Sequence, residues 1–261
     1  MKTLIKYELR QSRKALIIWL GILAMLVAFC YFEFLSLQDS LDEMARMLEE
    51  FPKLLKILFG VKSDLSTAIG WYSCLYFWCG LLVFAYGAVL GVSCVAKEKK
   101  QGTSEYLFTK PVGRGDIVLA KAAASVLHLA VFSVVCGLLN NFLLVRPMGG
   151  LERPGAVLST TVGLFLTELL FFSLGLFLAA AIPSYKKAVR ANTALMLGAY
   201  GLSFAAQYTG LRPLDFLTPL RYFDVYEVAV HGIQVPFLLL TVCITAFCVL
   251  GAKRRWELRE L

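Results

Sequence analysis

The stretch KEKKQGTSEYLFTKPVGRGDIVLAK, residues 97–121, is short, basic and polar, and it separates two long apolar runs. A cluster of lysines closes the apolar run that precedes it. Residues 102–109 can form one short amphipathic helix, which Pro111 ends because proline lacks a backbone N–H and disfavours helical geometry at the residue before it. Asp116 is a candidate N-cap for the helix that follows. The pattern predicts a structured loop between two long apolar helices.

The composition of the chain is typical of a membrane protein. Of its 261 residues, 59% are apolar and 17% are charged, and the mean hydropathy is +0.71, well above that of an ordinary soluble domain. The apolar residues gather in runs of about 20 or more, the length that a helix needs to cross the hydrocarbon core of a bilayer. These runs lack the polar stripe of a soluble amphipathic helix. We therefore expect an all-α integral membrane protein.

We expect six transmembrane helices in a single domain that covers residues 1–261. The expected spans cover about residues 15–37, 68–96, 116–145, 156–183, 191–209 and 237–252. The basic segment 1–14 is expected to be an interfacial helix that leads into the first span. In the second span, Gly87 and Gly91 form a GxxxG pattern, which lets another helix approach closely.

The basic residues predict the orientation of these spans. Of the 26 Lys and Arg residues, 18 lie in the segments expected on the inner side and 8 in those expected on the outer side. This excess satisfies the positive-inside rule and places both termini and the loop 97–121 in the cytoplasm, with the chain in the cell membrane. Because the charges gather at the ends of spans, they do not indicate a nucleic-acid partner.

The segment between the first two expected spans, about residues 38–67, carries a pattern of its own. Ser40 and Glu43 have the spacing of a capping box, and apolar residues then recur at helical spacing from Leu41 to Leu58. We expect an amphipathic helix on the outer membrane surface. The alternative interpretation is a cap over an exit path.

No catalytic motif is apparent in the sequence. It contains no P-loop, no Rossmann glycine pattern, no HExxH and no nucleophile elbow, so we expect a protein that is not an enzyme and binds no cofactor of its own. The seven cysteines are scattered through apolar runs without the spacing of metal ligands, and we expect no metal site.

Two ionisable residues lie near the middle of expected spans. Glu168 lies about midway along the fourth span and His128 about midway along the third, so both are expected at a similar depth. A carboxylate at the bilayer centre costs about 2.5–3.5 kcal/mol on insertion scales and needs a partner or a purpose. Glu168 either pairs with His128 or lines a transport path, or it is neutral and hydrogen-bonded to a nearby hydroxyl or carbonyl group.

The central loop resembles the first cytoplasmic loop of ABC exporter permeases of the second type, the ABC-2 family. The matching positions within the loop 97–115 are Glu98, Gly102, Thr103, Glu105, Leu107, Pro111 and Arg114. The basic N-terminal segment, the six expected spans and the stretch Pro219–Phe223 before the last span are also similar to that family. The resemblance covers nearly the whole chain, and only the central loop is specific.

The resemblance implies a permease subunit of an ATP-driven exporter. Residues 102–109 would then be a coupling helix that docks on separately encoded ATPase subunits, two copies of which hydrolyse the ATP, and the permease would pair with an identical or a paralogous second permease. Two other classes stay open from the residues alone. One is an ion- or proton-coupled secondary transporter that uses Glu168 and His128 as a relay, although no repeated half with broken helices is evident. The other is a non-transporting assembly or signalling membrane protein.

Overall fold

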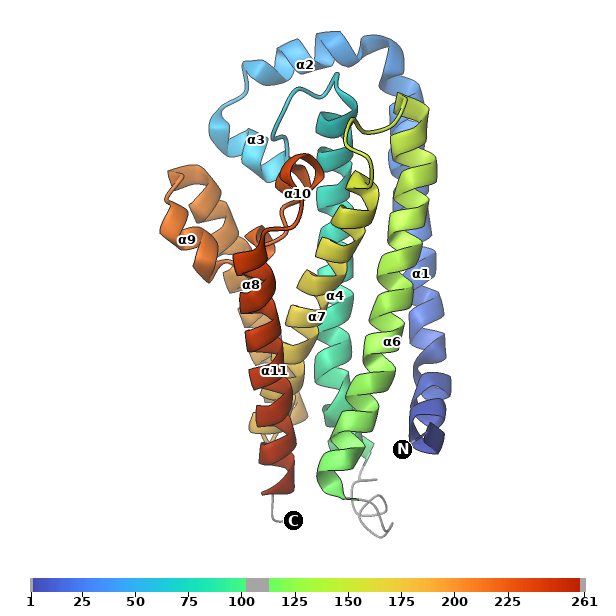
Figure 1. Ribbon diagram of the computed structural model, residues 1–261, viewed down its shortest axis with the longest axis vertical. Coiled ribbons are helices and arrows are strands. Elements are labelled where there is room, and N and C mark those ends of the chain that lie inside the picture. The colour runs from blue at the N-terminus through green and yellow to red at the C-terminus, as the bar shows by residue number, and fades with distance from the viewer. Residues whose placement is uncertain (1, 102–112, 259–261) are drawn as a thin grey trace.

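The computed structural model describes residues 2–101 and 113–258, which form a bundle of long helices with short helices packed at one end (Figure 1). Its described residues contain helices and no strand. The long helices are α1 (Lys2–Leu37), α4 (Ala68–Gln101), α6 (Arg114–Asn140), α7 (Ala156–Ala181), α8 (Tyr185–Thr209) and α11 (Val235–Glu257). The all-α architecture predicted from the sequence is therefore confirmed.

The short elements connect the long helices at the end of the bundle that lies opposite the chain termini (Figure 1). They are η1 (Gln38–Ser40), α2 (Leu41–Glu49), α3 (Lys53–Phe59), η2 (Asn141–Val145), η3 (Arg146–Met148), α9 (Arg212–Leu217), η4 (Pro219–Arg221) and α10 (Val225–His231). Of these, η2 is a single turn of π-helix that continues α6.

Helices α4 and α7 form the centre of the bundle and share its most extensive contact. Glycines permit this contact. A Cβ on Gly87 would lie 2.7 Å from the carbonyl oxygen of Glu168, and one on Gly91 would lie 3.0 Å from the carbonyl carbon of Phe172. On the other side of the contact, a Cβ on Gly175 would lie 2.8 Å from the carbonyl oxygen of Ala88. The prediction that the GxxxG pattern admits a closely packed helix is confirmed.

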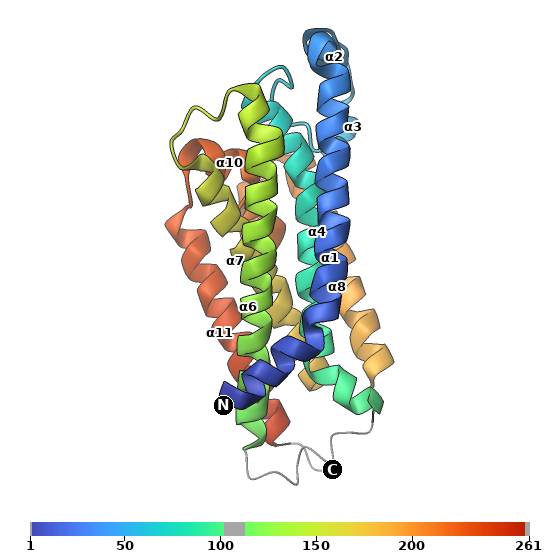
Figure 2. The ribbon, with the colours of Figure 1, turned by 90° about the vertical axis from the view of Figure 1, so that its right-hand side faces the viewer.

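The other long helices surround this central pair. Helix α1 packs mainly on α6, α11 packs on α7 and α6, and α8 packs on α4 and α7. The N-terminal segment expected at the membrane surface and the first expected span form one continuous helix, α1. Its first turns run at an angle to the rest of the helix (Figure 2). Helix α6 begins at Arg114 with Gly113 as its N-cap residue, so the prediction that Asp116 is the N-cap was wrong by three residues.

Five helical stretches in the described part of the chain are long and apolar enough to cross a membrane. They are Thr3–Glu49, Ala68–Val95, Gly115–Met148, Ala156–Ala181 and Val235–Glu257. Residues 191–209 were expected to be the fifth of the six spans, and they lie in α8, a helix of 25 residues beside α4 and α7. It does not meet the same measure of apolarity, because charged residues occupy its first turns and Gln207 and Tyr208 lie near its end.

The helix ends agree with the alternation that the charges predicted. The start of α1, the end of α4, the start of α6 and the end of α11 lie at one end of the bundle, beside both termini (Figures 1 and 2). We call this the inner end and the opposite one the outer end, following the distribution of Lys and Arg.

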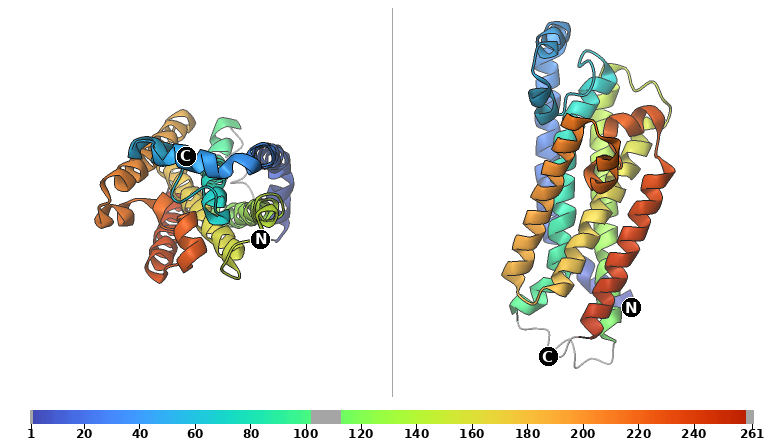
Figure 3. Two further views of the ribbon diagram at one scale, coloured as in Figure 1. Left: turned by 90° about the horizontal axis from the view of Figure 1, so that it is seen from above. Right: turned by 90° about the vertical axis from the view of Figure 1, so that its left-hand side faces the viewer.

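At the outer end, residues 38–67 form a strap that runs from the end of α1 to α8. Seen from above, α2 crosses over the bundle (Figure 3). The expected amphipathic helix is interrupted, because Pro52 separates α2 from α3. The predicted capping box was wrong as well. The chain passes from α1 through a 3-10 turn into α2, and the Ser40 hydroxyl donates back to the Leu37 carbonyl oxygen at 3.2 Å instead of capping a free helix start.

The strap is attached to α8 by a lysine. Lys53 of α3 donates to the carbonyl oxygen of Tyr208 at 2.7 Å, and its amine lies 5.6 Å from the centre of the Tyr208 ring. A cation at the carbonyl end of a helix stabilises it through the helix dipole. The strap therefore joins the outer ends of α1 and α8.

The segment 210–236 folds back against the bundle. The side chains of Tyr222 and Phe223 are buried, and the Phe223 Cβ would lie 2.9 Å from a Cβ on Gly163, in the third turn of α7. Tyr222 stacks on Phe237 of α11 with ring centres 5.2 Å apart. Through these contacts, Tyr222 and Phe223 pack against α11 and α7 instead of lying above the bundle.

Candidate functional site

The residues predicted to couple the chain to an ATPase surround the connection between α4 and α6 at the inner end. Glu98 lies in the last turns of α4, and Arg114 is the first residue of α6. Five of the predicted positions lie outside the described residues, namely Gly102, Thr103, Glu105, Leu107 and Pro111. The structure therefore places the two flanks of the predicted coupling loop, and the roles of these seven residues stay predictions.

The start of α6 is held by both ends of the chain. Lys121, which is 6% exposed, forms an ion pair with Glu8 of α1 at 2.8 Å. Helix α11 also packs on α6, and a Cβ on Gly115 would lie 2.7 Å from the Lys253 Cε and 2.9 Å from the Glu257 carboxyl carbon. The helix that follows the predicted coupling loop is thus in direct contact with the N-terminal turns of α1 and the C-terminal turns of α11.

Glu168 is fully buried at the centre of the bundle, where α4, α6 and α7 meet. The Ser133 hydroxyl of α6 donates to its Oε2 at 2.6 Å, and Oε1 has no hydrogen-bond partner among the described residues. A carboxyl group in such an environment is costly unless it is neutral or paired. The sequence left a hydrogen bond between Glu168 and a nearby hydroxyl group as one possibility. Such a hydroxyl group is present on the neighbouring helix α6.

His128 is also buried, at 6% exposure, on the same helix as Ser133. Its Nδ1 makes no hydrogen bond within the described part of the chain, and no hydrogen bond or ion pair joins His128 to Glu168 there. The structure brings Glu168 together with Ser133 and not with His128. Whether either residue lines a transport path stays a prediction.

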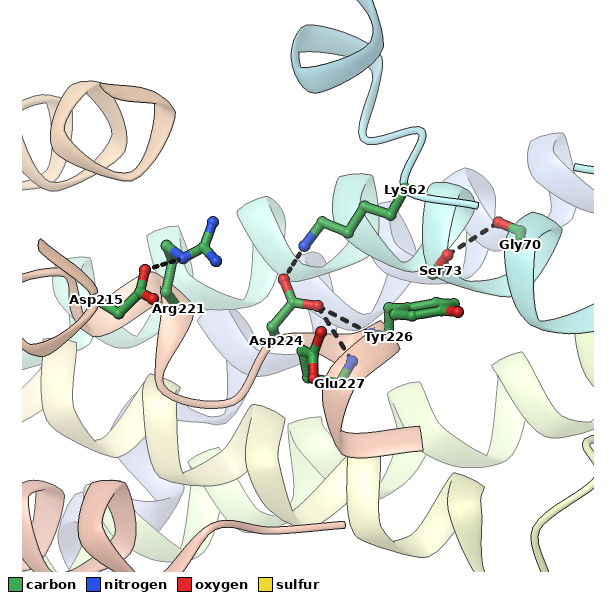
Figure 4. A network of polar contacts seen from close by, with 8 residues as sticks. All are labelled: Lys62, Gly70, Ser73, Asp215, Arg221, Asp224, Tyr226 and Glu227. Carbon is green, nitrogen blue, oxygen red and sulfur yellow. Dashed lines mark hydrogen bonds and ion pairs between the residues drawn. The ribbon is translucent and has the colours of Figure 1, made fainter. Parts of the chain in front are cut away.

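A second polar group, absent from the sequence-based predictions, lies at the outer end (Figure 4). Lys62, which follows α3, contacts the carboxylate of Asp224 in an ion pair, and Arg221 contacts Asp215 at 2.6 Å. Asp224 is also the N-cap of α10, because its Oδ1 accepts from the backbone N–H of Tyr226 at 3.1 Å. The Lys62–Asp224 pair fastens the strap to the segment 210–236, whereas the other two contacts lie within that segment.

The Lys62–Asp224 pair is largely withdrawn from solvent, with side-chain exposures of 22% and 10%. Burial, followed by the nearby Arg221 guanidinium, lowers the pKa of Lys62 to about 7, whereas Glu227 opposes this change. The contact with Asp224 favours the protonated amine. The charge of Lys62 therefore depends on the carboxylate beside it.

Part of this outer polar group could have been recognised in the sequence, because it begins a helix. Asp224 and Glu227 have the spacing of a capping residue and a third-position acid, which is a recognisable helix start. Lys62 and Glu8 could not be recognised in this way, because their partners, Asp224 and Lys121, lie far away along the chain.

No metal centre is present in the part of the chain that the structure describes. No group of three or more His, Cys, Asp or Glu side chains there could hold a metal ion. None of the seven cysteines forms a disulfide.

The family model described as "ABC-2 family transporter protein" matches residues 2–252, which is nearly the whole chain. No curated protein matches the sequence of this chain. The match includes both flanks of the central loop and all the long helices, except the last turn of α11 beyond residue 252. The chain therefore belongs to the ABC-2 family of transporter proteins and is a multi-pass membrane permease of an ABC transporter.

Proposed function

We propose that this permease is the membrane subunit of an ATP-driven exporter. Two copies of a separate ABC ATPase bind at the inner end, and the permease pairs with a second permease subunit, identical or paralogous. ATP is bound and hydrolysed by the ATPase partners. The chain lies in the cell membrane with both termini in the cytoplasm, as the excess of Lys and Arg at that end favours.

The observation that supports this proposal most is the arrangement around the start of α6. Residues 97–115 resemble the ATPase-docking loop of the family, and the helix after them contacts α1 through the Glu8–Lys121 pair and α11 near Gly115. A push on this loop would therefore act on three long helices together. Rigid-body movement of packed helices is a common way to convert such a push into a change of state.

The charges of the loop suit recognition of a protein partner. Glu98, Glu105 and Arg114 bring both signs to a short segment, and complementary charges fix the register of an interface. Glu168 and His128 stay candidates for the transport path in this proposal.

The test is co-purification of the permease with an ABC ATPase subunit from the membranes of its own host. We expect the double variant Glu105→Lys/Leu107→Lys to lose the ATPase. The matched control is Glu43→Lys/Met47→Lys, which also replaces one glutamate and one apolar residue by lysines, on exposed positions of α2 at the outer end. The control should retain the ATPase. Retention of the ATPase by the loop variant as well would contradict the docking assignment.

A further inference from the structure

A row of basic side chains runs along the first turns of α1 at the inner end of the bundle. The side chains of Lys6, Arg10, Arg13 and Lys14 are all exposed. Residues three and four positions apart are neighbours on one face of a helix, and these four follow that spacing. We call these four residues the basic stripe.

The basic stripe has no acidic partner within the permease. Glu8 is the only acidic residue among the first 32 of the chain, and it forms an ion pair with Lys121 of α6. In the part of the chain that the structure describes, none of the four basic side chains takes part in an ion pair. Four unpaired positive charges on one exposed face favour an anionic partner outside the chain.

The same face of α1 continues into exposed apolar side chains. Ile17 and Ile18 follow Arg13 and Lys14 by one helical turn, and their side chains are 54% and 63% exposed. Met25, two turns further on, is 77% exposed. The bundle leaves this face of a membrane-spanning helix uncovered, so these side chains suit contact with acyl chains. The basic stripe therefore ends where the hydrocarbon of the inner leaflet begins.

The bend in α1 keeps the basic stripe close to the membrane surface. Between Lys6 and Lys14 the helix rises by roughly 12 Å, whereas the head-group region on each side of a bilayer is roughly 5–8 Å thick. A straight continuation of the span would carry Lys6 past the head groups into water. The first turns instead run at an angle to the rest of α1 (Figure 2). The angle brings the basic side chains back toward the depth of the lipid phosphates.

We propose that the basic stripe binds an anionic phospholipid of the inner leaflet. The phosphate lies against Arg10 and Arg13, because the guanidinium group matches phosphate oxygens in a bidentate contact, and the acyl chains lie along Ile17 and Ile18. The head group carries no amine, as in phosphatidylglycerol, because the neighbouring lysines would repel a second cation. Lipid binding is a property of the permease alone, so it can be absent while ATPase docking holds, and the reverse.

The experiment uses the full-length permease in nanodiscs of phosphatidylcholine. The probe is a phosphatidylglycerol with a photoreactive diazirine in its acyl chain, close to the glycerol, and mass spectrometry locates the labelled residues. We expect saturable labelling of α1 around Ile17 and Ile18, which unlabelled phosphatidylglycerol suppresses. A phosphatidylcholine with the same diazirine should label this part of α1 far more weakly. Equal labelling by the two probes would overturn the proposal.

The dependence on salt gives a second measurement on the unaltered permease. Raising the ionic strength from about 0.1 M to about 1 M shortens the screening length from about 10 Å to about 3 Å. The preference of α1 for the phosphatidylglycerol probe should shrink accordingly. A preference that salt leaves unchanged would contradict an electrostatic origin.

A pair of variants tests the arginines. Arg10→Gln/Arg13→Gln removes two of the four charges, and at about fivefold for each cation we expect the half-saturating concentration of the probe to rise about thirtyfold. The control Arg10→Lys/Arg13→Lys keeps the charges and should stay within a few fold of the unaltered permease. A further control, Lys186→Gln/Lys187→Gln, removes two exposed cations from α8 at the inner end and should leave the labelling of α1 unchanged.

The variants also distinguish a lipid from a protein partner. All substituted side chains are exposed, so we expect each variant to elute and melt like the unaltered permease. If the glutamine variant bound the probe normally but lost the ATPase in co-purification, the basic stripe would belong to an acidic surface of that subunit, and the lipid assignment would be wrong.

Discussion

Replacing Gly87 by alanine tests whether the contact between α4 and α7 holds the bundle together. The new Cβ would lie 2.7 Å from the carbonyl oxygen of Glu168 and 2.8 Å from its Cγ, whereas ordinary contact begins at 3.4 Å. The oxygen belongs to the backbone of α7, so it cannot rotate away. The two helices would have to separate by about 0.7 Å where their packing is closest.

The cost of that separation can be bounded. Overpacking of a well-packed core costs about 1–3 kcal/mol, and alanine regains up to about 1 kcal/mol over glycine through its helix propensity. We therefore expect Gly87→Ala to lower the free energy of unfolding by up to about 2 kcal/mol. At about 2–4 °C for each kcal/mol, this is a fall of several degrees in melting temperature.

The assay is thermal melting of the detergent-solubilised permease, followed by size-exclusion chromatography. The melting temperature of Gly91→Ala should be lower than that of Gly87→Ala, because two backbone groups, the Phe172 carbonyl and the Leu176 amide, obstruct its Cβ. Gly198→Ala is the control, since a Cβ there would meet nothing within 4 Å, and it should melt at or slightly above the unaltered protein. The reasoning is refuted if all three variants melt together.

Two further predictions concern buried polar groups. Glu168→Gln preserves the shape of the side chain and an acceptor for the Ser133 hydroxyl. We therefore expect its melting temperature to lie within a few degrees of that of the unaltered protein, and its transport in proteoliposomes to be slower. Normal transport would show that Glu168 is not part of the transport path. Glu8→Lys places a second cation beside Lys121, and we expect it to uncouple transport from ATP hydrolysis, with recovery in Glu8→Lys/Lys121→Glu. Equal loss in the single and double variants would mean that the charge pair is not what matters.

The sequence predicted the long helices well because each depends on local information. An apolar run of sufficient length forms a helix wherever it lies in a bilayer, and the spacing of Gly87 and Gly91 marks the face on which another helix packs. The pattern did not show which helix that is. The identity of α7 as the partner depends on contacts between residues about 80 positions apart, such as Gly87 and Glu168.

The errors arose where neighbouring elements changed a local preference. Ser40 has the chemistry of an N-cap, but α1 runs on through η1, so the position is not a free helix start. The hydrophobic periodicity of the outer segment continued across Pro52, and the proline decided the break. The positions of the candidate site that sequence reasoning missed, Lys62 and Glu8, acquire their meaning only from partners that the fold supplies.

Helix α4 connects the inner end of the permease to its outer end, so a movement at one end can be transmitted to the other. It is one continuous helix from Ala68 to Gln101, it packs beside α8, and Gly87 and Gly91 hold its middle against α7. The middle contact lies roughly 30 Å from the outer end of the helix. A rigid rod held at its middle moves its two ends in opposite directions. An ATPase that displaces the inner end of α4 would move its outer end relative to α8, a helix without comparably tight glycine contacts at Gly198 and Gly201. We therefore expect a push at the coupling loop to change the separation of α4 and α8 at the outer end.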